Sequence, residues 1–297
     1  MSDAQLPHRR PRSKHIRYAL ETAAAYAVYG FFRLLPRDAA SATGGFIARR
    51  FGPLLSSTAT ARKNIARAFP EKTAAEREKI LRGMWDNIGR TAAEYAHLHR
   101  IWECVGLEGG EHLDAVRESG KPAIFCGGHI GNWEINAIAA KKRGVGIHLI
   151  YRKPNNPGVD GLLRHARASG AAGHIEKGRA GAQEMLSVLK QNGVLGILVD
   201  QKLNEGIPAP FFGHDAMTTT APAQFALHFG CPLYPAYIER TQGCHFKMMI
   251  FPALETPATG NREQDIRAVT LKLNELLESW IRKRPEQWLW IHKRWPD

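Results

Sequence analysis

Cysteine is scarce in this sequence of 297 residues, and long apolar runs are absent from it. The four cysteines, Cys104, Cys126, Cys231 and Cys244, are scattered without a CxxC pair, which excludes a zinc ribbon and a dense disulfide framework. They favour a reducing, cytosol-facing location. No apolar segment with a small-residue cleavage site follows the N-terminus, so we predict no secretory signal peptide.

Acidic residues are also few, since 28 Asp and Glu stand against 41 Lys and Arg, which gives a formal net charge of +13. Such a balance favours an anionic partner, either nucleic acid or an anionic membrane surface. The sequence has no recognised nucleic-acid-binding motif, and its strongest basic cluster precedes an apolar helix. We therefore expect a membrane partner and no nucleic acid.

The N-terminus combines a basic head, residues 1–17, with a predicted helix over residues 18–35. The head carries five cations, Arg9, Arg10, Arg12, Lys14 and Arg17. Between Glu21 and Arg33 the helix has no charged residue, but this interior is shorter than the roughly 20 residues that span a bilayer. We expect the helix to lie in the membrane interface. A crossing with Glu21 and Arg33 reaching the interface, and an ordinary buried helix, stay open.

The remainder of the chain changes from helical to alternating patterns. Apolar spacing predicts helices within residues 39–55 and 73–100. From residue 121 on, short apolar runs bounded by Gly and Pro predict core strands at 122–126, 147–151, 194–199, 233–238 and 246–251. Helical stretches fall at 133–143, 180–191 and 266–280. This alternation predicts an α/β fold with a largely parallel central sheet flanked by helices. We divide the chain into the head, a membrane-associated helical region at 18–60 and an α/β domain at 61–297.

One segment has the residues for chemistry, and it reads Cys126-Gly-Gly-His-Ile-Gly-Asn-Trp-Glu134. His129 follows a predicted strand and precedes a predicted helix, the junction where ligands collect in open α/β sheets. An imidazole is a suitable base for an alcohol at neutral pH, and Glu134 could accept its other N–H. The five-residue spacing of His129 and Glu134 is by itself only weak support for a catalytic pair. No HExxH or other recognised metal-ligand spacing occurs, so we predict no metal.

This segment resembles the His-x4-Asp/Glu block of the glycerolipid acyltransferase superfamily. Its context resembles the late acyltransferases of lipid A biosynthesis, the lauroyl and myristoyl acyltransferases. Matching blocks occur in order along nearly the whole chain, at Ala61-Arg-Lys-Asn-Ile-Ala-Arg-Ala-Phe-Pro70, Tyr151-Arg-Lys-Pro-Asn-Asn-Pro157, Val199-Asp-Gln201, Pro210-Phe-Phe-Gly213 and Pro285-Glu-Gln-Trp-Leu-Trp-Ile-His-Lys-Arg-Trp295.

The resemblance implies catalysis by His129, with Glu134 orienting and supporting it. We expect an oxyanion donor among backbone N–H groups near Gly127 and Gly128 or the following helix start. The residues that we expect to bind substrate are Asn132, Arg152, Lys153, Arg179, Asp200 and Gln201. The cations among them are suited to phosphate, and the carboxylate of Asp200 and the amide of Gln201 to sugar hydroxyls. The C-terminal tryptophans Trp288, Trp290 and Trp295 fit either a membrane-interface belt or core packing.

The resemblance further implies an O-acyltransferase on the cytoplasmic face of the inner membrane. Its donor would be acyl-acyl carrier protein, its acceptor a Kdo-bearing lipid A precursor, and it would need no cofactor. A lysophospholipid or a mannoside glycolipid is an alternative acceptor, and an inactive membrane lipid-binding protein is the alternative of another class. The sequence predicts neither the acyl length nor an oligomeric state.

Overall fold

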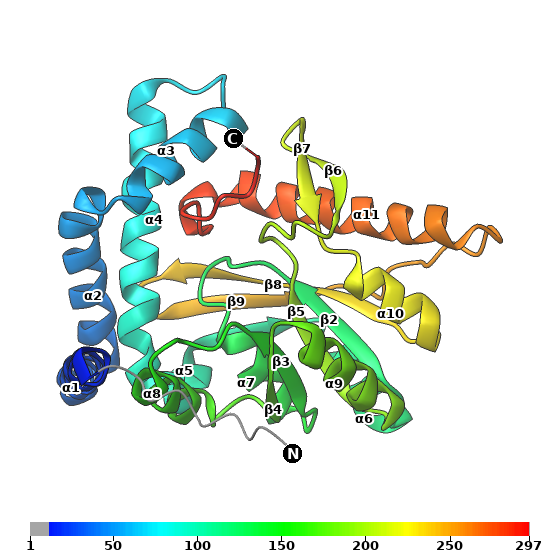
Figure 1. The fold of residues 1–297 in the computed structure, drawn as a ribbon, viewed down its shortest axis with the longest axis horizontal. Helices are drawn as coiled ribbons and strands as arrows, with labels where there is room; N and C mark the ends of the chain where they lie inside the picture. Colours follow the sequence, from blue (N-terminus) through cyan, green and yellow to red (C-terminus); the bar gives the residue numbers. More distant parts are fainter. Residues whose placement is uncertain (1–11, 297) are drawn as a thin grey trace, which may run out of the picture.

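The computed structural model describes residues 12–296, and a seven-stranded sheet lies at its centre (Figure 1). The strand order is β1-β9-β8-β2-β5-β3-β4. The strands are β1 Val105–Glu108, β2 Ala123–Gly127, β3 Ile147–Tyr151, β4 Gly173–Glu176, β5 Val194–Leu198, β8 Leu233–Gln242 and β9 His245–Ile250. From β8 to β4 all neighbours are parallel, whereas β9 is antiparallel to β8 and pairs in parallel with β1. The predicted α/β class is confirmed.

The five predicted strands are β2, β3, β5, β8 and β9, and all are confirmed. Side chains alternate between the faces of a strand, and β2 is buried on both. Ala123 and Phe125 join one apolar cluster, and Ile124 and Cys126 join the other. This double burial explains why β2 is a continuous apolar run. The sequence did not predict the short edge strands β1 and β4, nor the hairpin of β6 Ile207–Phe211 and β7 His214–Thr218.

Helices cover both faces of the sheet (Figure 1). One face packs against α9 Arg179–Lys190, α10 Ala221–Phe229 and α11 Arg262–Lys283. The other packs against α5 Leu98–Ile101, α6 Gly110–Ser119, α7 Ile135–Lys142 and α8 Pro157–Arg167. The short 3-10 turns are η1 Gly52–Leu54, η2 Tyr95–His97, η3 Trp102–Cys104 and η4 Pro285–Gln287. The predicted helices α7, α9 and α11 are confirmed within a few residues of their bounds.

Four helices from the N-terminal part gather at one end of the sheet (Figure 1). They are α1 Arg12–Leu34, α2 Arg37–Phe51, α3 Ser57–Ala68 and α4 Ala74–Glu94. The helices α2 and α4 pack so closely that a Cβ placed on Gly44 would lie 2.3 Å from the carbonyl oxygen of Gly89. The division predicted at residue 60 falls inside α3. Of the basic head, Arg9 and Arg10 lie outside the described residues, and Arg12 begins α1.

The N-terminal helices leave apolar side chains in solvent. Among the described residues, every exposed large apolar side chain falls within residues 16–55, on α1, on α2 and on the turn after it. These are Ile16, Leu20, Tyr26, Val28, Phe31, Leu34, Phe46, Ile47, Phe51, Leu54 and Leu55. Within residues 12–296 no helix combines the length and the apolar character needed to cross a membrane.

The C-terminal segment lies in the core between α4 and α11 (Figure 1). Trp288, Trp290 and Trp295 are 2%, 0% and 3% exposed, so core packing is correct for them and the interface belt is wrong. The indole N–H groups of all three donate to oxygens of the protein, as buried tryptophans require. Ile130 forms a β-bridge with Trp288 and so joins the segment to the loop after β2.

A buried polar network fixes that loop, residues 128–134, against α4 and β8. Asn87 donates to the carbonyl oxygen of Gly131 at 2.9 Å, and its own oxygen accepts from Arg240 Nε at 3.0 Å. The guanidinium of Arg240 also binds both carboxylate oxygens of Glu94. Glu94 in turn accepts from Asn132 Nδ2 at 2.8 Å. Because Glu94 is fully buried and Arg240 nearly so, these bonds satisfy charges that water cannot reach.

We expect Glu94→Ala to lower the free energy of unfolding by about 3–5 kcal/mol, because it leaves the Arg240 guanidinium buried without its counter-charge. Urea denaturation of the full chain measures this. Arg62→Ala, which breaks the exposed pair with Glu78, is the control and should cost at most about 1 kcal/mol. A loss of the same small size in both variants would contradict the assignment.

Candidate active site

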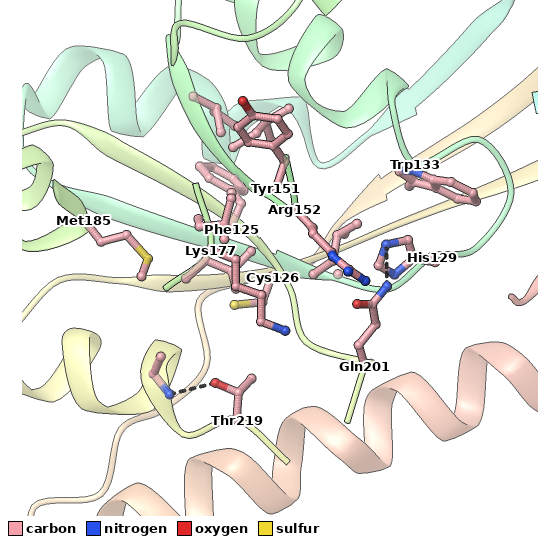
Figure 2. A pocket seen from close by; sticks show the side chains of 18 of the residues that line it. Phe125, Cys126, His129, Trp133, Tyr151, Arg152, Lys177, Met185, Gln201 and Thr219 are labelled. Atoms are coloured by element: carbon pink, nitrogen blue, oxygen red, sulfur yellow. Dashed lines mark hydrogen bonds between the residues drawn. The ribbon is translucent and has the colours of Figure 1, made fainter. Parts of the chain in front are cut away.

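The candidate site is a cavity of about 910 Å³ at the carboxyl ends of β2, β3 and β5. These strands are parallel neighbours, so the segments that follow them meet at one edge of the sheet. His129 follows β2, Arg152 follows β3 and Gln201 follows β5. Figure 2 shows the side chains of these three residues converging at the mouth of the cavity.

Asp200 is the hydrogen-bond partner of His129. Its Oδ1 lies 2.8 Å from His129 Nδ1, and its Oδ2 accepts from the backbone N–H of His129 and from Trp288 Nε1, both at 2.7 Å. Burial alone would raise the pKa of Asp200, but the charge and hydrogen bonds of His129 and the indole N–H outweigh it and hold the pKa far below its usual value. Asp200 is therefore an ionised acceptor. The hydrogen of a neutral His129 must then sit on Nδ1, which leaves Nε2 free to accept a proton.

The predicted pairing of Glu134 with His129 is wrong in this structure. Glu134 is 5% exposed, and its carboxylate accepts from Arg167 Nε and Nη2, both at 2.7 Å. Tyr95 Oη donates to it at 2.5 Å and Trp133 Nε1 at 3.0 Å. A carboxylate this deeply buried needs a cation, and the guanidinium on α8 supplies it. Asp200, which follows the strand next to β2, takes the place beside the imidazole.

Opposing effects act on the Glu134 and Arg167 charges. Burial would raise the pKa of Glu134, but the Arg167 hydrogen bonds and charge, with those of Tyr95 and Trp133, lower it overall. Burial would lower the pKa of Arg167, yet Glu134 raises it. Both groups therefore stay charged as an internal ion pair. Sequence reasoning missed Arg167 and Tyr95, because no short motif links them to Glu134.

A second histidine lies beside the first. Gln201 Nε2 is 3.3 Å from His129 Nε2 and 3.0 Å from His292 Nε2, and the two imidazole centroids are 5.8 Å apart. Burial, with contributions from the neighbouring His129 and Lys177, lowers the pKa of His292 against the opposing effect of Asp200 and favours its neutral form. His292 stands in the C-terminal signature that the sequence singled out as a whole, and its spacing from Gln201 gave no signal.

The other predicted residues divide between the cavity and the scaffold. Arg152 and Arg179 line the cavity, as does Lys177, which the sequence did not nominate. Lys153 is instead not among the residues that line the cavity, and its Nζ lies 3.8 Å from Glu176 Oε2. Asn132 is fully buried: its Nδ2 donates to Glu94 and its Oδ1 accepts from the Glu134 N–H at 3.2 Å. The predicted substrate contact of Asn132 is thus replaced by a role in holding the loop.

Within residues 12–296 no group of three or more His, Cys, Asp or Glu side chains is arranged to hold a metal ion. The functional groups at the cavity include the imidazole of His129, the cations Arg152, Lys177 and Arg179, and the amide of Gln201. Around them lie apolar side chains from both faces of the sheet, among them Phe125, Leu149 and Met185. This arrangement can remove a proton from a ligand that is part anionic and part apolar.

Comparison with known proteins agrees with this chemistry. Lipid A biosynthesis lauroyltransferase of Escherichia coli (strain K12) is 24% identical over 243 residues, 78% of this chain and 76% of the relative. Lipid A biosynthesis acyltransferase of Haemophilus influenzae is 27% identical over 248 residues, 78% of this chain and 73% of the relative. The solved 1-acyl-sn-glycerophosphate acyltransferase of Thermotoga maritima covers 81% of this chain and 99% of its own, but a TM-score of 0.39 at 14% identity is too low to carry an inference.

The family model described as bacterial lipid A biosynthesis acyltransferase matches residues 6–297, nearly the whole chain. The resemblance seen in the sequence blocks is thereby confirmed. This chain belongs to the bacterial lipid A biosynthesis acyltransferase family and is an enzyme.

Proposed function

We propose that the enzyme transfers a fatty acyl chain from acyl-acyl carrier protein to a hydroxyl group of a lipid A precursor. The observation that carries this proposal is His129, whose Nδ1 is bound to the ionised Asp200 and whose Nε2 faces the mouth of a largely apolar cavity. An alcohol becomes a good nucleophile only as its proton is removed, and this nitrogen is placed to remove it. The names of the relatives supply the acceptor.

Asp200 has the supporting role that we first gave to Glu134. When His129 takes the hydroxyl proton it becomes an imidazolium, and the adjacent carboxylate stabilises that charge while keeping the ring oriented. The proton then passes to the leaving thiolate of the donor. Glu134 is a positioning residue. Together with Arg167 it fixes the start of α7 and the end of the loop at residues 128–134.

The cavity lining supports a substrate with an apolar chain and an anionic head. Apolar side chains from β2, β3 and β5 continue inward from His129. Around the mouth stand Arg152, Lys177 and Arg179, and Arg179 begins α9, where helix N-terminal N–H groups also favour anions. These cations are suited to the phosphate of a phosphopantetheine arm or of the lipid A precursor.

We expect His129→Ala to lower the acyl-transfer rate by about 10²- to 10⁴-fold, because the general base is lost. Asp200→Asn should cause a comparable loss, since an amide would favour the wrong tautomer of His129. The assay follows the transfer of labelled acyl chains from acyl-acyl carrier protein to a Kdo-bearing lipid A precursor.

Asp215→Asn, an exposed change of the same type on β7, is the control and should keep full activity. Transfer at the normal rate in His129→Ala would reject the mechanism. Transfer by the wild type to a lysophospholipid or a mannoside in place of the precursor would reject the acceptor, as would transfer to none of them.

We propose further that residues 18–60 attach the enzyme to the cytoplasmic face of the inner membrane. Exposed apolar side chains of the described chain fall almost wholly in this region, and exposed arginines such as Arg49 and Arg50 stand beside them. Apolar area and basic charge together favour an anionic bilayer surface. Asn156 ties α1 to the site: it accepts from Thr22 Oγ1 at 3.0 Å and donates to the Tyr18 carbonyl oxygen at 2.8 Å, four residues beyond Arg152.

We expect Leu34→Gln with Leu54→Gln to weaken binding to vesicles of phosphatidylglycerol and phosphatidylethanolamine by at least about tenfold. These side chains are 86% and 80% exposed in the free protein, and they would lose contact with the acyl region. Vesicle sedimentation measures the change. Lys272→Gln on α11, which removes one exposed cation, should have little effect. Unchanged binding of the double leucine variant would mean that charge alone drives binding.

A further inference from the structure

The side-chain amide of Gln201 lies between the imidazoles of His129 and His292. Figure 2 shows it pointing toward His129 at the cavity. We propose that Gln201 is the oxyanion donor of the acyl-transfer step and that His292 is the residue that positions it. This proposal rests on the proposed function above, since it concerns the thioester carbonyl that an acyl donor would bring to His129.

Hydrogen-bond chemistry fixes the orientation of this amide. In the neutral form of His129, which the general base requires, the ionised Asp200 holds the hydrogen on Nδ1 and Nε2 is an acceptor. An amide nitrogen has two hydrogens and no lone pair, so Gln201 Nε2 can donate to His129 Nε2 with one hydrogen and to His292 Nε2 with the other. The reverse orientation would set an amide oxygen against the lone pair of His129. Gln201 is therefore a double donor.

Four of the backbone N–H groups in the region where we expected the oxyanion site are already engaged. The N–H of His129 donates to Asp200, that of Ile130 to the Gly128 carbonyl oxygen at 2.8 Å, and that of Gly131 to the Gln287 carbonyl oxygen at 3.1 Å. At the helix start, the N–H of Glu134 donates to Asn132. The predicted backbone site is thus unsupported at these four positions. The side-chain N–H of Gln201, next to His129, can supply the hydrogen bond that these four backbone groups cannot.

Gln201 occupies the place that the acceptor hydroxyl must take. A hydroxyl that approaches His129 Nε2 within hydrogen-bond distance displaces the Gln201 N–H from that nitrogen, while the bond to His292 still holds the amide in place. The released N–H then lies beside the attacking oxygen, and hence beside the carbonyl under attack. A donor that is fixed before the reaction stabilises developing charge without reorganisation.

In the proposed reaction, acyl transfer passes through a tetrahedral intermediate. The acceptor oxygen forms a bond to the thioester carbon as its proton moves to His129 Nε2, and the carbonyl π pair moves to oxygen, where the Gln201 N–H binds the negative charge. Collapse of the tetrahedral intermediate restores the carbonyl and breaks the carbon–sulfur bond. The leaving sulfur takes the proton from His129 and departs as the thiol.

His292 is itself held firmly. Asn64 on α3 donates to the carbonyl oxygens of Trp290 and His292, at 2.8 and 2.6 Å. Two residues further on, Arg294 is fully buried and donates to the Met217 carbonyl oxygen at 2.9 Å. The C-terminal segment therefore fixes the imidazole that anchors Gln201.

The test is a comparison of Gln201→Ala and Gln201→Glu with the wild type in two assays. With acyl-acyl carrier protein and the Kdo-bearing lipid A precursor, we expect kcat to fall by about 10²- to 10³-fold with little change in KM for the precursor. Without the precursor, hydrolysis of the acyl donor by water should fall by a similar factor, because it passes through the same oxyanion. Gln201→Glu keeps the shape of the side chain but replaces the donor with an anion, so it should be no better than Gln201→Ala.

Gln191→Ala on an exposed turn is the control and should change neither rate. A raised KM for the precursor with unchanged kcat and hydrolysis would make Gln201 a sugar contact and overturn this inference. A kcat of Gln201→Ala within threefold of the wild-type value would also overturn this inference. If His129→Ala also transfers acyl chains normally, it is the proposed function that fails; if His129→Ala is inactive and Gln201→Ala is normal, only the oxyanion assignment fails.

The role of His292 is tested by a double-mutant cycle. We expect His292→Ala to lower kcat and donor hydrolysis in the wild-type background but to cause no further loss in the Gln201→Ala background, because it acts through the amide. His292→Asn, which retains a hydrogen-bond acceptor, should recover part of the lost rate. Additive losses in the double variant would overturn the positioning role.

Discussion

The pair of hydrogen bonds from His129 to Asp200 is the interaction on which the site depends. It joins the segment after β2 to the segment after β5, and it fixes both the backbone and the ring of the histidine with one carboxylate. The parallel register makes this possible, since Gly127 pairs with Leu198 and so brings the two strand ends level. A carboxylate buried to this degree is stable only because two N–H groups and an indole N–H supply three donors to it.

The rest of the scaffold serves to hold the loop that carries the histidine. Glu94 and Asn87 bind it from α4 and are held in turn by Arg240 of β8, and Arg167 binds its far end from α8. These elements come from distant parts of the sequence, and each contributes a side chain whose charge is neutralised inside the protein. The loop therefore has little freedom to move, which suits a base that must meet its substrate in one geometry.

The sequence predicted the sheet better than it predicted the site. Strands such as β2 are buried on both faces, so a continuous apolar run marks them, whereas the edge strands β1 and β4 are too short to leave such a pattern. His129 and Asp200 were both recognised at strand ends. The five-residue spacing to Glu134 nevertheless suggested the wrong partner, because linear distance does not tell which strands are neighbours. Tyr95, Arg167 and His292 lie 34, 38 and 163 positions from His129, beyond the reach of any local pattern.

The C-terminal segment affects the order in which the parts of the active site can assemble during synthesis. Trp288 binds Asp200 across 88 positions, and Asn64 binds the backbone of His292 across 228. During synthesis α1 and α2 leave the ribosome well before the residues that complete the site. The segment proposed to bind the membrane is thus made long before the reactive imidazole gains its ordered surroundings.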